Sequence, residues 1–198
     1  MVAGEFVVAE VEHADGIPDH AQVATLVAHL RTGNPAAAAL LDRLFREAAL
    51  RFCWGYLGSM EEAEDALQDI WCKVLAAPEV PDRFRPWLYR IARNHCLNVL
   101  RNEARRRDGH DLPAPSQIEA ILTGHLTRMV KDEARQRVTE IVRDLPASQQ
   151  EVLRLRYVEG LSRSEVAEVL DLAESVVKSR LFEGLRKLRE HASILENL

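Results

Sequence analysis

The sequence predicts an all-α protein made of two small helical domains joined by a flexible linker. The helix formers Ala, Leu, Glu and Arg are frequent, whereas aromatic residues make up only 6% of the 198-residue chain. Apolar residues recur at helical spacing on both sides of residues 108–133. That segment contains Gly109, Pro113 and Pro115 and has little periodicity, so we expect it to be the linker.

The composition is that of a globular protein of the cell interior. Hydrophobic residues make up 47% of the chain and charged residues 29%, which excludes a disordered chain. The longest purely apolar run, residues 36–41, is too short to span a membrane, and the N-terminus lacks the basic residues of a signal peptide. Cys53, Cys72 and Cys96 are scattered and odd in number, which predicts free thiols. We therefore expect a cytoplasmic protein.

The first part of the chain is expected to form an acidic extension followed by a helical hairpin. Residues 1–20 carry five acidic residues and no Lys or Arg, and we expect them to be loosely ordered. From residue 21 to residue 57 the apolar spacing is helical, with a break at residues 32–35 (Thr-Gly-Asn-Pro).

A third helix is expected to begin at Ser59 and to end before Pro78. Ser59 and Glu62 have the spacing of a capping box. The apolar stripe of this helix consists of Ala63, Ala66, Leu67, Ile70, Trp71 and Val74, and the acidic residues lie on the other side.

A fourth helix is expected from about Pro86, a favoured first-turn residue, to about Arg107. Residues Leu88, Ile91, Ala92, Val99 and Leu100 make much of its buried face. On another face, side chains recur every three or four residues at Arg90, Asn94, Asn98, Arg101 and Arg105.

The net charge of −5 is unevenly distributed. Residues 57–82 carry seven acidic residues against Lys73, and residues 83–107 carry eight arginines against Glu103. An acidic segment followed directly by a basic one predicts two different partners for adjacent surfaces. Residues 134–198 carry 11 basic and 11 acidic residues, which predicts weak DNA binding by this part alone.

After the linker, helical patterns cover residues 134–145, 148–158, 162–170 and 174–190. The last two have the layout of a helix-turn-helix, with Ser162 as a cap and a tight break at residues 171–173. The outward face of the second helix carries residue types that bind bases or phosphates in the major groove, namely Ser175, Lys178, Ser179, Phe182 and Arg186. An ordinary helical hairpin with a solvated face has the same spacing, so the pattern alone leaves both interpretations open.

Aromatic residues lie at the junction of the acidic and basic helices. Phe84, Trp87 and Tyr89 beside arginines suit single-stranded nucleic acid, because rings stack on unpaired bases. Aromatic residues at helical spacing are usually buried, so spacing alone favours a core role for them.

Several motifs together resemble the extracytoplasmic-function (ECF) class of bacterial RNA polymerase sigma factors. Residues 63–69 (AEDALQD) resemble the family's acidic polymerase-binding motif, and residues 87–94 (WLYRIARN) resemble the helix that melts and reads the −10 element. Residues 144–146, 160–167 and 177–181 resemble its C-terminal domain, which reads the −35 element. The resemblance covers about residues 21–190, in the family's order and spacing.

This resemblance implies a sigma region 2 helical bundle at residues 21–107 and a sigma region 4 helix-turn-helix at residues 134–198. It implies that core polymerase binds Asp65, Gln68 and Asp69. It implies that −10 DNA is contacted by Phe84, Trp87, Arg90, Asn94, Asn98, Arg101 and Arg105. It implies that −35 DNA is contacted by Ser175, Lys178, Ser179, Phe182 and Arg186. The implied partners are core RNA polymerase, promoter DNA and an anti-sigma factor that holds the protein inactive, with no cofactor.

Three features depart from the family pattern. Residues 76–85 are a few residues shorter than the loop that holds a flipped base in many relatives, which puts −10 specificity in doubt. Glu183 stands where a basic residue is common, which removes a phosphate contact or alters −35 preference. Asp171 occupies a turn position where Gly is common, but Asp tolerates a left-handed backbone, so the turn is expected to form.

Other functional classes fit the sequence less well. Cys72, His95 and Cys96 lack the spacing of a closed zinc site, and there is no Gly-rich phosphate loop or GxSxG motif, so we expect neither a metal site nor an enzyme. A plain helix-turn-helix regulator and a sigma-mimicking adaptor are the alternatives. The regulator has no need of the acidic motif, and the adaptor has no need of Asn94 or of the basic recognition face.

Overall fold

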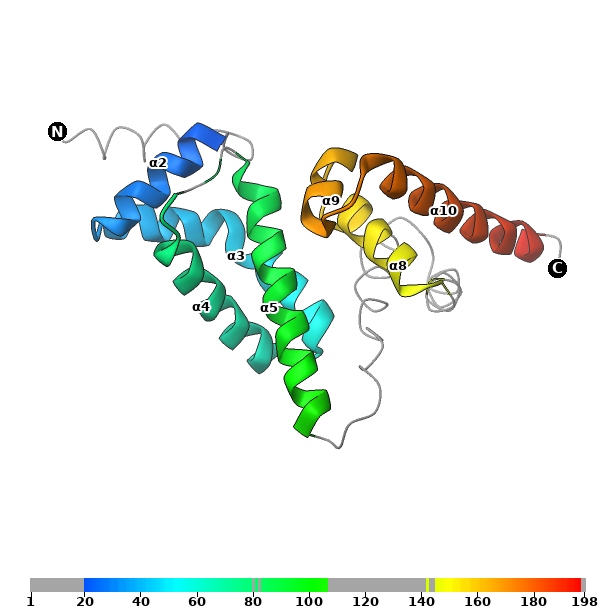
Figure 1. The fold of residues 1–198 in the computed structure, drawn as a ribbon, viewed down its shortest axis with the longest axis horizontal. Helices are drawn as coiled ribbons and strands as arrows, with labels where there is room; N and C mark the ends of the chain where they lie inside the picture. Colours follow the sequence, from blue (N-terminus) through cyan, green and yellow to red (C-terminus); the bar gives the residue numbers. More distant parts are fainter. Residues whose placement is uncertain (1–19, 80, 82, 107–141, 143–144, 197–198) are drawn as a thin grey trace.

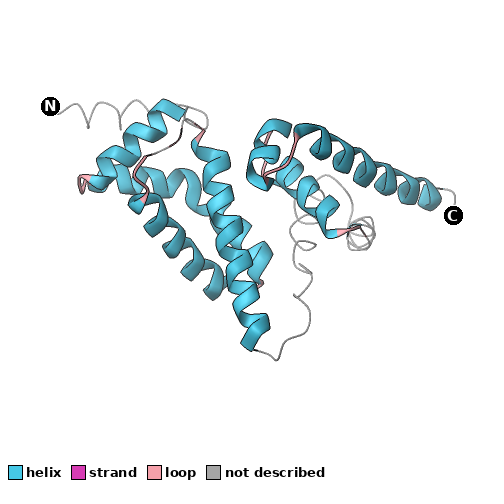
Figure 2. Ribbon diagram, in the orientation of Figure 1, coloured by secondary structure: helices cyan, strands magenta, loops and turns pink. Residues whose placement is uncertain are grey.

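The computed structural model describes residues 20–79, 81, 83–106, 142 and 145–196. Every regular element in these ranges is a helix, which confirms the all-α prediction, and the helices form an N-terminal and a C-terminal bundle (Figure 1, Figure 2). The expected acidic extension (apart from residue 20), the linker at 108–133 and most of the helix expected at 134–145 lie outside the described residues. In the described ranges no helix is long and apolar enough to cross a membrane.

The N-terminal bundle begins with the expected helical hairpin. The side chain of Asn34 accepts a hydrogen bond from the Ala36 backbone N–H at 3.0 Å, and Pro35 is the first residue of the second helix. Gly58, with a φ of 77°, ends that helix. The fourth helix begins two residues earlier than expected, at Phe84. The four helices are α2 (His20–Arg31), α3 (Pro35–Leu57), α4 (Met60–Ala76) and α5 (Phe84–Arg106).

The C-terminal bundle departs from the sequence prediction in one element. The helix expected at 148–158 is an α-helix followed by a π turn, in which the Glu159 backbone N–H donates to the Arg154 carbonyl at 3.1 Å. The expected helix-turn-helix follows it and is confirmed, although its second helix extends to Glu196. The elements are α8 (Ala147–Leu153), η2 (Arg154–Val158), α9 (Arg163–Leu170) and α10 (Glu174–Glu196).

The buried apolar side chains of both bundles form one connected core. Phe52 of α3 and Leu155 of η2 are both fully buried in it. Helix α9 packs beside α5, so the bundles are in direct contact (Figure 1). Helix α10 packs on α8 at Gly184, where an added Cβ would lie 3.0 Å from Leu153 Cδ1. Burial of these apolar surfaces is the main contribution to holding the helices in place.

Candidate functional site

The exposed side of α4 brings together the three side chains expected to bind polymerase. Ser59 caps the helix, since its side chain accepts a hydrogen bond from the Glu62 backbone N–H at 3.3 Å. The apolar side of α4 packs toward the other helices of the bundle through Ala63, Ala66, Leu67, Ile70 and Val74. The acidic face of α4, Asp65, Gln68 and Asp69, is exposed. Two carboxylates and an amide in this position can bind Lys or Arg side chains of a partner.

A hydrogen-bonded pair of basic residues lies beside this face. Lys73 Nζ is 2.6 Å from His95 Nδ1, and His95 Nε2 is 3.6 Å from Asp69 Oδ2. An ammonium group can only donate, so Nδ1 accepts and the ring proton is on Nε2, facing Asp69. Partial burial and the charge of Lys73 lower the pKa of His95, although Asp69 acts in the opposite direction. His95 is therefore mainly neutral near pH 7.

Helix α5 carries a continuous polar face, which we call the Arg/Asn face. The side chains of Arg90, Asn94, Asn98, Arg101 and Arg105 are all exposed, as the sequence pattern predicted. Arg101 also donates a hydrogen bond to Asn98 Oδ1 at 3.1 Å, so neighbouring members of the face contact each other. Guanidinium groups beside amides can bind phosphates and the hydrogen-bonding edges of unpaired bases.

Phe84 does not belong to this face. Its ring is fully buried, with its centroid 5.2 Å from that of Phe45 and 5.7 Å from that of Trp87. The reason is that α5 begins at Phe84 and turns this ring toward the bundle core. A base has no access to the ring in this structure, so the expected −10 contact of Phe84 is replaced by a core role. Tyr89 is buried as well, which leaves the half-buried Trp87 as the accessible aromatic candidate.

The helix-turn-helix is closed by local bonds at Ser162, the residue that the sequence predicted as a cap. Ser162 Oγ accepts from the Glu165 backbone N–H at 3.2 Å, and the Glu165 carboxylate accepts from the Ser162 backbone N–H at 2.7 Å. Partial burial raises the pKa of Glu165, but the bonds from Ser162 and nearby arginines outweigh burial and lower it. Asp171 adopts the left-handed conformation, with φ 55° and ψ 50°, and ends α9.

The outward side of α10 carries the expected recognition residues. Ser175, Lys178 and Ser179 are exposed, and the Phe182 ring is 62% exposed. An exposed aromatic ring can contact the thymine methyl groups of the major groove. Val176, which the sequence analysis did not select, is also exposed. We call Ser175, Lys178, Ser179 and Phe182 the recognition face.

Arg186 differs from the other recognition residues because acidic neighbours pair with it. Its guanidinium lies 3.1 Å from Glu183 Oε2 and 2.6 Å from Glu190 Oε1. These hydrogen bonds and charges raise the pKa of Arg186. Glu183 is the position that departs from the family pattern, and here its carboxylate offsets the charge of a residue expected to bind phosphate.

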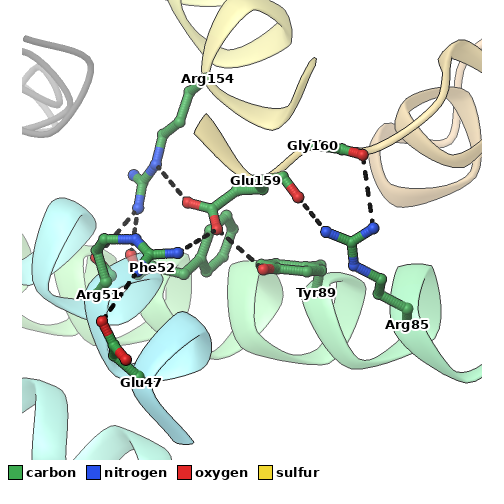
Figure 3. Close-up of polar contacts among 8 residues, drawn as sticks. All are labelled: Glu47, Arg51, Phe52, Arg85, Tyr89, Arg154, Glu159 and Gly160. Atoms are coloured by element: carbon green, nitrogen blue, oxygen red, sulfur yellow. Dashed lines mark hydrogen bonds and ion pairs between the residues drawn. The ribbon is translucent and has the colours of Figure 1, made fainter. Parts of the chain in front are cut away.

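A charged cluster that the sequence analysis did not find lies between the two bundles (Figure 3). From the C-terminal bundle come Arg154 and Glu159, whose side chains are completely buried. Tyr89 donates a hydrogen bond to Glu159 Oε2 at 2.9 Å, and Arg51 Nη2 lies 3.6 Å from the same oxygen. Arg85 donates to the Glu159 and Gly160 carbonyls. We call these side chains, Arg51, Arg85, Tyr89, Arg154 and Glu159, the interdomain cluster.

Arg154 reaches from η2 into the N-terminal bundle. Its Nη2 donates to the Phe52 carbonyl at 2.6 Å, and its guanidinium carbon lies 4.6 Å from the Phe52 ring centroid and 4.9 Å from that of Tyr56. A cation over aromatic rings gains electrostatic stabilisation in a desolvated site. The periodicity of an α-helix could not predict this placement, because the π turn changes the angle between successive side chains along η2.

Two further ion pairs join the bundles beside the cluster. Glu151 of α8 accepts from Arg93 at 2.7 and 3.3 Å and from the Tyr56 hydroxyl at 2.5 Å. Arg83 Nη1 lies 2.8 Å from Glu168 Oε2 of α9. The first pair is bidentate and mostly buried, which is the stronger geometry for an arginine and a carboxylate.

The Cys and His residues considered as metal ligands are not gathered into one site. Cys72 is exposed, whereas Cys96 is buried. Among the residues that the structure describes, no three His, Cys, Asp or Glu side chains are placed to hold a metal ion.

Comparison with known sequences matches both halves of the chain. The family described as Sigma-70 region 2 matches residues 41–106, and the family described as Sigma-70, region 4 matches residues 135–188. The ECF RNA polymerase sigma factor SigL of Mycobacterium tuberculosis (strain H37Rv) is 30% identical over 171 residues, covering 80% of this chain and 92% of SigL. The ECF RNA polymerase sigma factor SigW of Bacillus subtilis (strain 168) is 25% identical over 174 residues, covering 83% of this chain and 93% of SigW.

Two solved structures have a similar fold. CnrH, in complex with the cytosolic domain of CnrY, has a TM-score of 0.56 and 24% identity, covering 87% of this chain and 96% of CnrH. The sigma factor RpoE from Bartonella quintana, in complex with the anti-sigma factor NepR, has a TM-score of 0.52 and 24% identity, covering 74% of this chain and 91% of RpoE.

Proposed function

Because this chain belongs to the ECF family of RNA polymerase sigma factors, we propose that it binds core RNA polymerase and directs it to a specific set of promoters. Residues 21–107 form the domain that binds polymerase and the −10 element, and residues 134–198 form the domain that reads the −35 element. Residues 108–133 link the two domains. The protein acts by binding rather than by catalysis, and it works in the cytoplasm.

The observation that carries this proposal is the placement of two unlike faces on adjacent helices. The acidic face of α4 and the Arg/Asn face of α5 are both exposed, and α4 packs against α5. Polymerase binds the acidic face through basic residues, while Arg90, Asn94, Asn98, Arg101 and Arg105, together with Trp87, bind the unpaired −10 strand. Because the helix that binds polymerase and the helix that opens the DNA are neighbours, the opened bases stay close to the enzyme.

The recognition face of α10 supplies the second DNA contact. Lys178 and Ser179 donate hydrogen bonds to bases or phosphates, and Phe182 contacts an apolar part of the groove. Arg186 contributes less to DNA binding than its charge alone predicts, because Glu183 and Glu190 pair with it. The C-terminal half, which is near neutral in charge, therefore binds DNA weakly when alone, and attachment of both halves to one polymerase raises the effective concentration at the second element.

An anti-sigma factor completes the proposal. A chain with separate acidic and basic working faces needs them covered when the factor is idle, and a protein partner can cover both. Purification of the factor from uninduced cells tests this point. Recovery of a third protein at equal amount supports it, and recovery of only free factor and polymerase complexes contradicts it.

In vitro transcription tests the function directly. Core polymerase purified without any sigma factor is incubated with a fragmented genomic library, with and without this protein. We expect new transcription starts that share −35 and −10 sequences. Tight binding to core without any new start would contradict the proposal and indicate a sigma-like adaptor. A matched control carries Asn94→Ala and Asn98→Ala, which should keep core binding and lose most starts.

A further inference from the structure

Asp69 and Lys73 of α4 have the spacing of a helical ion pair, but they do not form one in the structure. Acid–base pairs four residues apart stabilise a helix most when the acidic residue comes first, as it does here. Asp42 and Arg46 of α3 have the same spacing and order, and they lie 3.4 Å apart. The Lys73 ammonium instead lies 2.6 Å from His95 Nδ1, so Lys73 does not neutralise the Asp69 carboxylate of the acidic face.

The bond from Lys73 to His95 is stronger than the helical pair that it replaces. A hydrogen bond that involves a charged group contributes more than an exposed ion pair, because water screens the exposed pair and both of its side chains must be ordered. The His95 side chain is only 12% exposed where α5 packs on α4, so water competes little for Nδ1. Lys73 is therefore held on the side of α4 that faces α5.

His95 leaves the Asp69 carboxylate accessible. Its Nε2 proton is directed at Asp69 Oδ2, but the distance of 3.6 Å is too long for a hydrogen bond. The Asp69 side chain is 67% exposed, so a partner can reach its oxygens. The neutral ring carries no charge that would offset the carboxylate. His95 thus keeps one cation away from Asp69 without supplying another.

We propose that His95 is a positioning residue for polymerase docking, which holds the Lys73 ammonium away from Asp69 and so keeps the Asp69 carboxylate available to a basic side chain of core polymerase. His95 acts through Lys73 and Asp69 and does not itself contact the enzyme. This inference rests on the proposed function and adds a residue of the DNA-reading helix α5 to the supports of the docking helix α4.

Removal of the ring has a defined consequence for docking. In His95→Leu the Lys73 ammonium loses its acceptor and forms the helical pair with Asp69. Polymerase must then break this pair before it binds the carboxylate. An exposed pair of this spacing changes the core affinity by about twofold.

Protonation of His95 acts in the same direction as its removal. An imidazolium has no acceptor atom, so Lys73 must leave Nδ1, and the charged ring then faces Asp69 itself. Asp69 and Lys73, both on α4, are the charged groups that face the ring among the described residues. Core polymerase needs the free carboxylate and therefore binds the neutral form more tightly. Its affinity should fall as the pH drops through the pKa of His95.

The first experiment is a double-mutant cycle on core binding near neutral pH. The full-length native factor, His95→Leu, Lys73→Met and the double variant are each titrated with core polymerase. Lys73→Met removes a cation beside the acidic face in both backgrounds, so the decisive quantity is the ratio of its two effects. We expect Lys73→Met to improve binding by about twofold more in the His95→Leu background than in the native one. Equal effects would overturn the proposal and leave His95 as a filler of the contact between α4 and α5.

The pH dependence supplies a second readout, with His95→Asn as the matched control. The Asn side-chain oxygen takes the place of Nδ1 as the acceptor for Lys73, but the amide does not titrate. Near neutral pH, His95→Asn should bind core within about twofold of the native factor. At a pH about one unit below 6.5 it should have lost less affinity than the native factor, whose other histidines it keeps. Equal losses, with both proteins folded by circular dichroism, would contradict the role of His95.

A third measurement needs no substitution. In the native factor labelled with a magnetic nitrogen isotope, the chemical shifts of the ring nitrogens report which of them carries the proton. We expect a neutral His95 ring with its proton on Nε2, and a proton on Nδ1 would exclude the bond from Lys73 and refute the proposal. A native factor that binds no core would contradict the proposed function itself. Additive effects in a factor that does bind core would overturn only the role of His95.

Discussion

Replacing Tyr89 with Phe removes one hydroxyl from the interdomain cluster and leaves the ring in place. The hydroxyl donates to Glu159 Oε2 at 2.9 Å, and both residues are buried. The ring has a separate role, since it makes an edge contact with Phe52 at 5.0 Å between centroids. Tyr89→Phe therefore tests the polar contact between the bundles while preserving the core of the N-terminal bundle.

The expected effect depends on which hydrogen bonds the Glu159 carboxylate accepts. Its Oε1 already has no hydrogen-bond partner among the described residues, and Arg51 lies 3.6 Å from Oε2 as an ion pair only. Tyr89→Phe thus removes the side-chain hydrogen bond that Oε2 accepts from the other bundle. A hydrogen bond to a charged group contributes about 1.5–3 kcal/mol. Its loss corresponds to a rise of about 10- to 150-fold in the fraction of molecules whose two bundles are separated.

The assay is energy transfer between labels at Cys72 and Arg189→Cys, followed over a urea series below global unfolding. We expect Tyr89→Phe to separate its bundles at lower urea than the native factor. The helical content should not change, because the ring contact is kept. A separation midpoint equal to that of the native factor would show that the Tyr89–Glu159 bond does not hold the bundles together.

The same bond predicts a dependence on alkaline pH. Burial and the neighbouring Glu159 raise the pKa of Tyr89 well above its usual range. When the bundles separate, the phenol loses the Glu159 carboxylate and part of its burial, so its pKa moves toward the usual value of about 10. The form in which the two bundles are in contact therefore binds the Tyr89 hydroxyl proton more tightly. The contact between the bundles loses stability as pH rises above about 10. Tyr89→Phe should lose less of this contact than the native factor over that range.

Three further predictions concern the binding faces and their supports. Asp65→Arg with Asp69→Arg should weaken core polymerase binding with unchanged helical content, and an unchanged affinity in a pull-down would contradict the docking assignment. Lys178→Ala should weaken −35 duplex binding by about 1–3 kcal/mol if Lys178 reads a base, and an unaltered footprint would count against that role. The lowered pKa of His95 means that the unfolded chain binds a proton more readily, so folding stability should fall as pH drops below about 6.5. His95→Gln should flatten that part of the profile of melting temperature against pH, and an unchanged slope would show that His95 does not contribute to it.

The helices and their ends were predictable because their causes are local. Ser59, Asn34 and Ser162 cap helices through bonds to residues two or three positions away, and such bonds depend on short stretches of sequence. The exposed Arg/Asn face of α5 and the recognition face of α10 follow from helical periodicity, because polar residues at that spacing lie on one side. The combination of motifs also identified the family.

Other features depend on contacts between residues far apart in the sequence. Spacing places Phe84 beside Trp87 but does not say which of the two rings faces Phe45. The pairing of Arg186 with Glu183 and Glu190 became visible only with the side chains in place.

By itself, the sequence determined the helical elements, the polar faces they carry and the family, because periodicity and capping act within one helix. Only the tertiary structure decided how the two bundles meet. Arg154 and Glu159 look like ordinary solvated charges in the sequence, and they are buried because a π turn directs them at groups on α3 and α5. A local pattern contains no information about such groups, since their positions depend on how the whole chain packs.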